Sequence, residues 1–158
     1  MQMNGDVLGV VPGSVYELIE TITLTEDTVR IDRTAEPDGT PYKFQAVQVY
    51  GKNVGVTAEK YAYGAYANNY IVGVSGYLRA LNNNYFCAAI INENGLWFRR
   101  FACQSDDAWS SKQYPYIGHT RVSVEDYPYI TELTIRQLNG VPTTAGSIIE
   151  IWGVRADA

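Results

Sequence analysis

Polar and apolar residues alternate along much of the chain, which is the pattern of strands with one buried and one exposed face. The run from Val29 to Arg33 alternates at every position between apolar and charged side chains. The run from Tyr16 to Leu24 places most of its large apolar residues at even positions, and its central threonines are poor helix formers. Val, Ile, Thr and Tyr make up about a third of the chain, and these residues favour pleated, half-buried surfaces. The pattern therefore predicts an all-β protein.

Turn sequences separate the predicted strands. The stretch from Glu36 to Pro41 is the strongest turn signal, and Asn94-Gly95 is the residue pair that a two-residue type I′ hairpin turn requires. We expect eight or nine strands, over residues 16–24, 29–33, 44–49, 70–81, 85–91, 96–101, 121–125, 131–138 and 147–155. Strands at this spacing predict an antiparallel two-sheet β-sandwich, and we expect it to be a jelly roll. A closed barrel fits the same pattern.

Three segments lack this alternation. Residues 1–14 are small and apolar, and they predict an N-terminal arm or tether ahead of a single β-sandwich domain over residues 15–158. Residues 52–69 and 104–118 are polar and rich in tyrosine or serine. We expect them to be two long loops that cover the ends of the sandwich, the first with room for a short strand.

The charge balance narrows the choice of partners. Twelve Lys and Arg residues against 17 Asp and Glu give a net charge of −5. This balance disfavours nucleic acid as a partner, because phosphate binding needs a basic face. The chain has no run of about 18 apolar residues, so we expect no membrane span. Its first residues carry no positive charge ahead of an apolar core, so we expect no secretory signal.

The residues that catalysis needs are scarce, so we do not expect an enzyme. His119 is the only histidine, and neither a cysteine nor a Gly-x-Ser-x-Gly motif lies near it in the sequence. We expect it to make a structural hydrogen bond in a loop or at the start of a strand. One histidine and two cysteines are too few for a zinc site, and we expect no cofactor.

Cys87 and Cys103 lie on the two arms of the predicted hairpin, one residue out of register with each other. A single bulge would bring them opposite each other, as a cross-strand disulfide requires. Two buried thiols in a reducing compartment fit the same positions, and we favour this interpretation.

Adjacent carboxylates are the remaining candidates for chemistry. Neighbours on a strand point to opposite faces and would not act together, whereas pairs in loops usually face water or bind calcium weakly. We expect no metal site at these pairs, which are Glu26-Asp27, Asp106-Asp107 and Glu125-Asp126.

Aromatic side chains gather in the two predicted loops. Tyrosine offers a large amphipathic surface at a low entropic cost, so interfaces are enriched in it, and such rings also stack on sugars. We therefore expect a ligand site or a subunit interface there. For any single ring, a structural role at the end of the sandwich is the alternative. The candidate contact residues are Tyr61, Tyr63, Tyr66, Asn68, Asn69 and Tyr70 in the first loop, and Asp106, Trp109, Tyr114 and Tyr116 in the second.

The segment from Ala145 to Ala156 reads Ala-Gly-Ser-Ile-Ile-Glu-Ile-Trp-Gly-Val-Arg-Ala. It resembles the closing strand of bacteriophage virion proteins, whose β-sandwich domains form head fibres, capsid decoration proteins and tail-fibre tips. Residues 16–24 and 29–32 look like the opening strands of the same group. The resemblance implies a jelly roll that is assembled in the host cytoplasm and forms a symmetric trimer on the virion.

Two functions fit these observations. The first is a non-enzymatic virion structural protein that binds capsid or fibre proteins and adheres to host-surface glycans, with residues 1–14 tethering it by strand addition. The second is a carbohydrate-binding module, in which Trp109 and the tyrosines form a stacking platform while Asn68, Asn69 and Asp106 supply hydrogen bonds.

Overall fold

A computed structural model describes residues 15–57, 60–68, 72–78, 84–93, 96–105, 116–121, 128–137 and 140–156. These residues contain ten strands and no helix, and accordingly no helix long and apolar enough to cross a membrane. The strands are β1 (Glu17–Thr23), β2 (Arg30–Arg33), β3 (Phe44–Val54), β4 (Lys60–Ala67), β5 (Val72–Leu78), β6 (Asn84–Glu93), β7 (Leu96–Ser105), β8 (Tyr116–Arg121), β9 (Leu133–Gln137) and β10 (Ile148–Arg155). The predicted arm over residues 1–14 lies outside the described residues.

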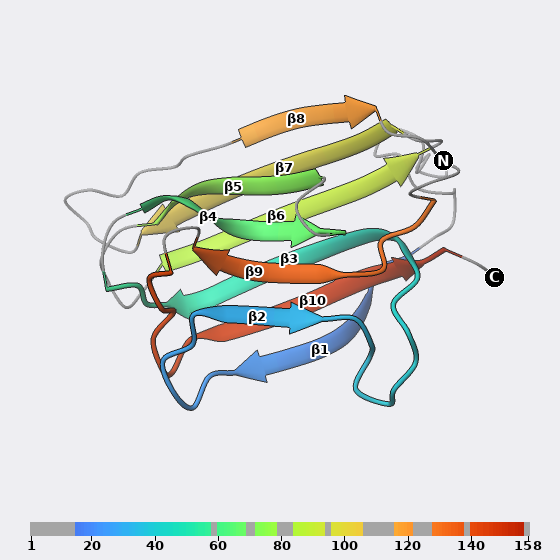
Figure 1. The fold of residues 1–158 in the computed structure, drawn as a ribbon. Helices are drawn as coiled ribbons and strands as arrows, with labels where there is room; N and C mark the ends of the chain where they lie inside the picture. Colours follow the sequence, from blue (N-terminus) through green and yellow to red (C-terminus); the bar gives the residue numbers. More distant parts are fainter. Residues whose placement is uncertain are drawn as a thin grey trace.

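The strands form two antiparallel sheets, with the smaller sheet in front of the larger one in Figure 1. The larger sheet has six strands in the order β1-β10-β3-β6-β7-β8, and the smaller has four in the order β2-β9-β4-β5. Every pairing between named strands is antiparallel. The prediction of an all-β, two-sheet sandwich is therefore confirmed.

Four of the strand pairs are nested in the sequence. The innermost pair is β4–β5, and β3–β6, β2–β9 and β1–β10 enclose it in turn. Successive pairs alternate between the smaller and the larger sheet. Among the described strands, only β7 and β8 stand outside this nesting, and they extend the larger sheet beyond β6.

Both sheets contribute to one hydrophobic core. Strand β10 illustrates how the alternation works, because Ile149 and Ile151 are fully buried while Glu150 and Trp152, at the alternate positions, face outward. Aromatic rings fill the centre, where Phe86 and Phe101 stack with their centroids 5.5 Å apart. Burying a side chain of this size is worth about 1.5–3 kcal/mol, so the core is the main source of stability.

Two glycines allow strands of the larger sheet to lie close to core rings. A Cβ atom on Gly153 would come within 2.7 Å of the Phe44 ring, and one on Gly51 within 2.1 Å of the Phe86 ring. Real side chains do not tolerate such approaches, so any larger residue would displace the ring beneath it.

The structure corrects the predicted loops. Residues 52–69 are not a long loop, because β3 continues to Val54 and β4 occupies residues 60–67. Every described side chain over residues 63–68 is buried, so this segment shows no alternation between polar and apolar residues. The second predicted loop is shorter than expected, since β7 extends to Ser105 and β8 begins at Tyr116.

The hairpin of β6 and β7 decides between the two interpretations of the cysteines. Pairing runs without a bulge from Asn84 opposite Ser105 to Glu93 opposite Leu96, which confirms the two-residue connection. Cys87 therefore pairs with Ala102, whereas Cys103 is on the other face of the sheet. No disulfide can form in this register, and Cys87 is a free thiol.

Candidate functional site

Two tyrosines of β4, Tyr63 and Tyr66, are buried. Tyr63 is fully buried, packs edge-on against Phe86, and its hydroxyl lies 2.9 Å from the hydroxyl of Thr143. Burial raises the pKa of Tyr63 to about 12. Tyr66 is only 8% exposed, with the Arg136 guanidinium 5.5 Å from its ring centroid. The prediction that these two rings meet a partner is wrong, because the core and Arg136 already cover them.

Asn68 is also a structural residue. Its backbone has a φ of 47°, a conformation that asparagine tolerates better than most residues. Its Nδ2 donates to the carbonyl of Tyr129 at 2.8 Å, and its Oδ1 accepts from the backbone N–H of Thr131 at 2.8 Å. The side chain thus joins the end of β4 to the segment that leads into β9. The prediction that Asn68 binds a ligand is wrong, since its polar atoms are used inside the protein.

The side chains of the other seven predicted contact residues lie outside what the structure describes. Tyr61 lies in β4 and Tyr116 in β8, but their side chains are outside what the structure describes. The remaining candidates, Asn69, Tyr70, Asp106, Trp109 and Tyr114, lie outside the described residues.

A different group of side chains forms a hollow on the outer face of the larger sheet. They alternate along two paired strands: Gln48, Tyr50 and Lys52 on β3, Glu150 and Trp152 on β10. In the register of this pair Trp152 lies opposite Gln48 and Glu150 lies opposite Tyr50, so all five side chains share one face. We call this group the β3–β10 hollow. It has a volume of about 350 Å³ and is widely open to solvent.

Hydrogen bonds fix the side chains of the β3–β10 hollow. The Tyr50 hydroxyl donates to Gln48 Oε1 at 2.8 Å. Lys52 Nζ donates to Glu150 Oε2 at 2.7 Å, and Trp152 Nε1 donates to the other carboxylate oxygen at 3.2 Å. These two donors hold the pKa of Glu150 below its usual value. Burial raises the pKa of Tyr50, so its hydroxyl is neutral at physiological pH.

The neighbours of the hollow differ on its two sides. On β6, Ala89 lies opposite Gln48, and Cys87 lies opposite Tyr50. The Tyr16 side chain lies close to Gln48, Tyr50 and Cys87 on this side. On the other side Leu18 of β1 lies opposite Trp152 and is 48% exposed, so it continues the apolar surface of the indole. The hollow therefore combines aromatic and aliphatic surface with hydrogen-bonding groups whose positions are already set.

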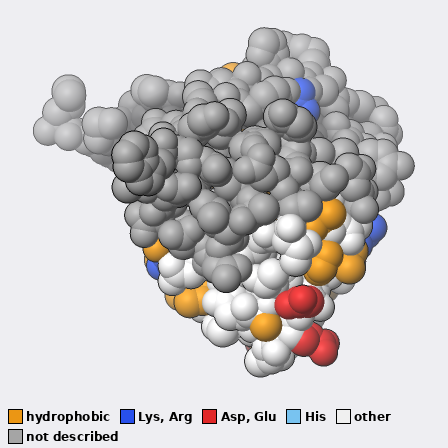
Figure 2. Space-filling model, turned by 90° about the vertical axis from the view of Figure 1, so that its left-hand side faces the viewer, with side chains coloured by type: hydrophobic (Ala, Val, Ile, Leu, Met, Phe, Trp, Pro, Cys, Tyr) orange, Lys and Arg blue, Asp and Glu red, His pale blue; other side chains and the backbone are white. Residues whose placement is uncertain are grey.

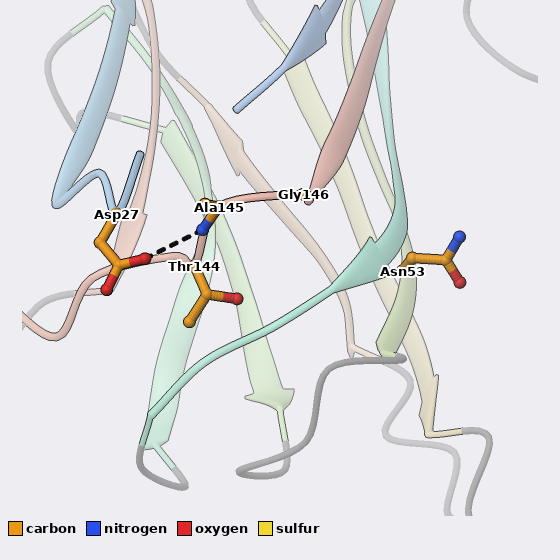
Figure 3. Close-up of a pocket in the computed structure, with 5 residues that line it drawn as sticks. All are labelled: Asp27, Asn53, Thr144, Ala145 and Gly146. Atoms are coloured by element: carbon orange, nitrogen blue, oxygen red, sulfur yellow. Dashed lines mark hydrogen bonds between the residues drawn. The ribbon is translucent and has the colours of Figure 1, made fainter. Parts of the chain in front are cut away.

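A second pocket, with a volume of about 490 Å³, lies at the end of the sandwich where β1 and β3 finish and β10 starts (Figure 3). Asp27 Oδ1 accepts the backbone N–H of Ala145 at 3.0 Å, which joins the β1–β2 turn to the turn before β10. The side chain of Asn53, also at this pocket, points away from the other labelled residues (Figure 3). Figure 2 views the molecule from this end, where the described surface shows acidic side chains and only separate small groups of hydrophobic ones. We see no converging set of ligand groups here.

Catalytic and metal-binding groups do not gather in the part of the chain that the structure describes. No three His, Cys, Asp or Glu side chains among those residues are placed to share a metal ion. Burial raises the pKa of the Cys87 thiol, which disfavours the reactive thiolate. His119 is in β8 opposite Phe98, inside a strand and not in the loop or strand start that we expected.

Comparison of the chain with protein-family models, with curated proteins and with solved structures gave no match. The class of protein is therefore defined by the chain itself. It is an antiparallel β-sandwich with a preformed aromatic and polar hollow on its larger sheet.

Proposed function

We propose that this chain is a non-enzymatic structural protein of a bacteriophage virion: a capsid decoration, head-fibre or tail-fibre-like module. It works through protein–protein contacts with copies of itself, as a trimer, and with capsid or fibre proteins. It is assembled in the host cytoplasm and resides on the virion.

The strand order is the observation that carries this proposal. We interpret the sandwich as a jelly roll, in which eight strands form nested pairs that alternate between two sheets. The pairs β1–β10, β2–β9, β3–β6 and β4–β5 follow this scheme, with β7 and β8 as an added hairpin arm. Jelly rolls with two such Greek keys are common in viral capsid proteins. Function is decided by sites and not by folds, so a second observation is needed.

The closing strand supplies that second observation. The segment that resembles phage virion proteins contains β10, which lies between β1 and β3 in the larger sheet. Ser147 Oγ accepts the backbone N–H of Gly55, Ile149 and Ile151 enter the core, and Gly153 lies against the Phe44 ring. The residues that carry the resemblance are therefore those on which the sandwich depends, which supports a shared fold with that group.

Two measurements test the proposal. Light scattering on a size-exclusion column should give a molar mass near three times 17.6 kDa. Mass spectrometry of density-gradient-purified phage particles, produced by the host cell that carries the gene, should detect peptides of this chain in stoichiometric amount. A host protein of similar abundance serves as the control for contamination. Particles without the chain would contradict the virion role, and a monomer at every concentration would contradict the trimer.

We do not propose a carbohydrate-binding module built on the tyrosine-rich segment as the function. Tyr63, Tyr66 and Asn68 are buried, and a stacking platform needs exposed rings. A different part of the surface meets that requirement.

A further inference from the structure

We propose that the β3–β10 hollow is a binding site for a neutral saccharide chain. The inference goes beyond the virion role, because it uses only the five side chains of the hollow and holds wherever the sandwich is attached. The argument depends on the preset geometry of the hollow, its mixed chemistry, its charge and its open shape.

The geometry is set before any ligand arrives. Trp152 and Lys52 both donate to the carboxylate of Glu150, at 3.2 Å and 2.7 Å. The indole cannot rotate freely while its N–H is held in this way. Binding would therefore lose little side-chain entropy, which is the usual cost of ordering an exposed aromatic ring.

The chemistry of the hollow matches a pyranose ring. A pyranose has faces of C–H groups and a rim of hydroxyls, so it needs apolar surface beside hydrogen-bonding groups. The half-buried rings of Trp152 and Tyr50 supply the apolar surface. The carboxylate of Glu150 accepts two hydrogen bonds already but has lone pairs for about two more, and the ammonium of Lys52 has two further hydrogens.

The charge of the hollow favours a neutral ligand. Among the described residues that line it, Lys52 and Glu150 are charged, and they neutralise each other across 2.7 Å. The Arg100 guanidinium does not line the hollow but lies near Tyr50. The carboxylate would repel an anionic ligand, whereas a cationic one would have to displace Lys52. A ligand whose hydroxyls both donate and accept hydrogen bonds disturbs this pair least.

The open shape favours a chain over a small free ligand. Sites for small molecules enclose most of the ligand surface. The β3–β10 hollow lies on a sheet face and is open to solvent. Leu18 is on one side of it, and Ala89, Cys87 and the Tyr16 side chain are on the other. A saccharide chain can cross such a face with one residue stacked on Trp152 and its neighbours in water.

The test uses the full chain and a printed array of neutral oligosaccharides of glucose, galactose, mannose and N-acetylglucosamine. We expect binding to at least one series, with an affinity that rises with chain length. The best oligosaccharide is then titrated by calorimetry against variants. We expect Trp152→Ala to weaken binding roughly tenfold or more, since a central aromatic contact carries much of the binding free energy. Tyr50→Ala should weaken it by several-fold.

A matched variant separates this site from a general loss of aromatic surface. Phe98 is exposed to 40% on β7, and β6 separates β7 from β3. Phe98→Ala should leave the affinity unchanged. Circular dichroism confirms that each variant is folded, and Tyr50→Ala replaces Trp152→Ala if the latter is not.

The outcomes are distinct. An array without any bound neutral oligosaccharide overturns the proposal, and so does binding that Trp152→Ala and Tyr50→Ala leave intact. Preference for anionic glycans overturns it as well, because it contradicts the charge argument. None of these results affects the particle mass spectrometry or the molar mass, so failure of this site and failure of the virion role are distinguishable.

Discussion

Tyr50 and Tyr63 both lie within strands, and the two sheets use them in opposite ways. Tyr50 faces outward from β3, half-buried, and donates its hydroxyl hydrogen to Gln48 on the surface. Tyr63 faces the core from β4, is fully buried, and shares a hydrogen bond with Thr143. Both hydroxyls are satisfied, yet only Tyr50 keeps part of its ring available to a ligand. The number of tyrosines in a segment therefore says little about binding until the buried face of each strand is known.

The largest expected effect is a difference in stability between the variants that remove the Tyr63 ring and the Tyr50 ring. Tyr63→Ala removes a fully buried ring and should lower the free energy of unfolding by about 3–5 kcal/mol. Tyr50→Ala acts at a half-exposed position and should cost less than about 1.5 kcal/mol. Urea denaturation followed by circular dichroism measures both. Equal losses would show that the outer face of the larger sheet is as tightly packed as the core.

A smaller effect tests the close contact between β10 and the core. Gly153→Ala places a methyl group 2.7 Å from the Phe44 ring and should cost about 1–3 kcal/mol in urea denaturation. Phe44→Leu destabilises the protein by itself but makes room for that methyl group. The double variant should lose less unfolding free energy than the sum of the losses in the two single variants. Strict additivity would mean that the strand does not depend on this contact.

The smallest effect appears at alkaline pH. The pKa of Tyr63 is about 12 in the folded chain, above the value of about 10 in an unfolded chain. The contribution of Tyr63 to the free energy of unfolding is fully present below pH 10. It is lost as the pH rises from 10 toward 12, because in this range only the unfolded chain releases the hydroxyl proton of Tyr63. In Tyr63→Phe the decline of unfolding free energy with pH should be shallower, by at most about 1.4 kcal/mol per pH unit. Urea titrations at several pH values measure this slope, and an unchanged slope would contradict the assignment.

The sequence predicts those strands in which one face is polar. The alternation over residues 29–33 and 147–155 gives β2 and β10 nearly to the residue. It misses β4, because alanine, glycine and tyrosine on both faces leave no polar side to mark it. The Asn-Gly pair predicts the hairpin of β6 and β7, while the register that separates Cys87 from Cys103 required the structure.

The β3–β10 hollow could be only half predicted. The outward positions of β3 carry Gln48, Tyr50 and Lys52, and those of β10 carry Glu150 and Trp152. Each set alone looks like the solvent-facing side of a strand. That the two sets meet is a consequence of pairing between strands far apart in the sequence, which periodicity does not encode. The prediction failed at Tyr63 and Tyr66 for a different reason, because both faces of β4 are buried over residues 63–68.

The position of β10 also has a consequence for the time course of synthesis. This strand lies between β1 and β3, yet the ribosome makes it after both of them and after every other described strand. Until it emerges, β1 has no partner, and β3 exposes an edge beside the unfilled gap. Such edges recruit strands from other chains. The nascent protein is therefore most exposed to aggregation just before its closing strand arrives, and insertion of that strand protects both edges at once.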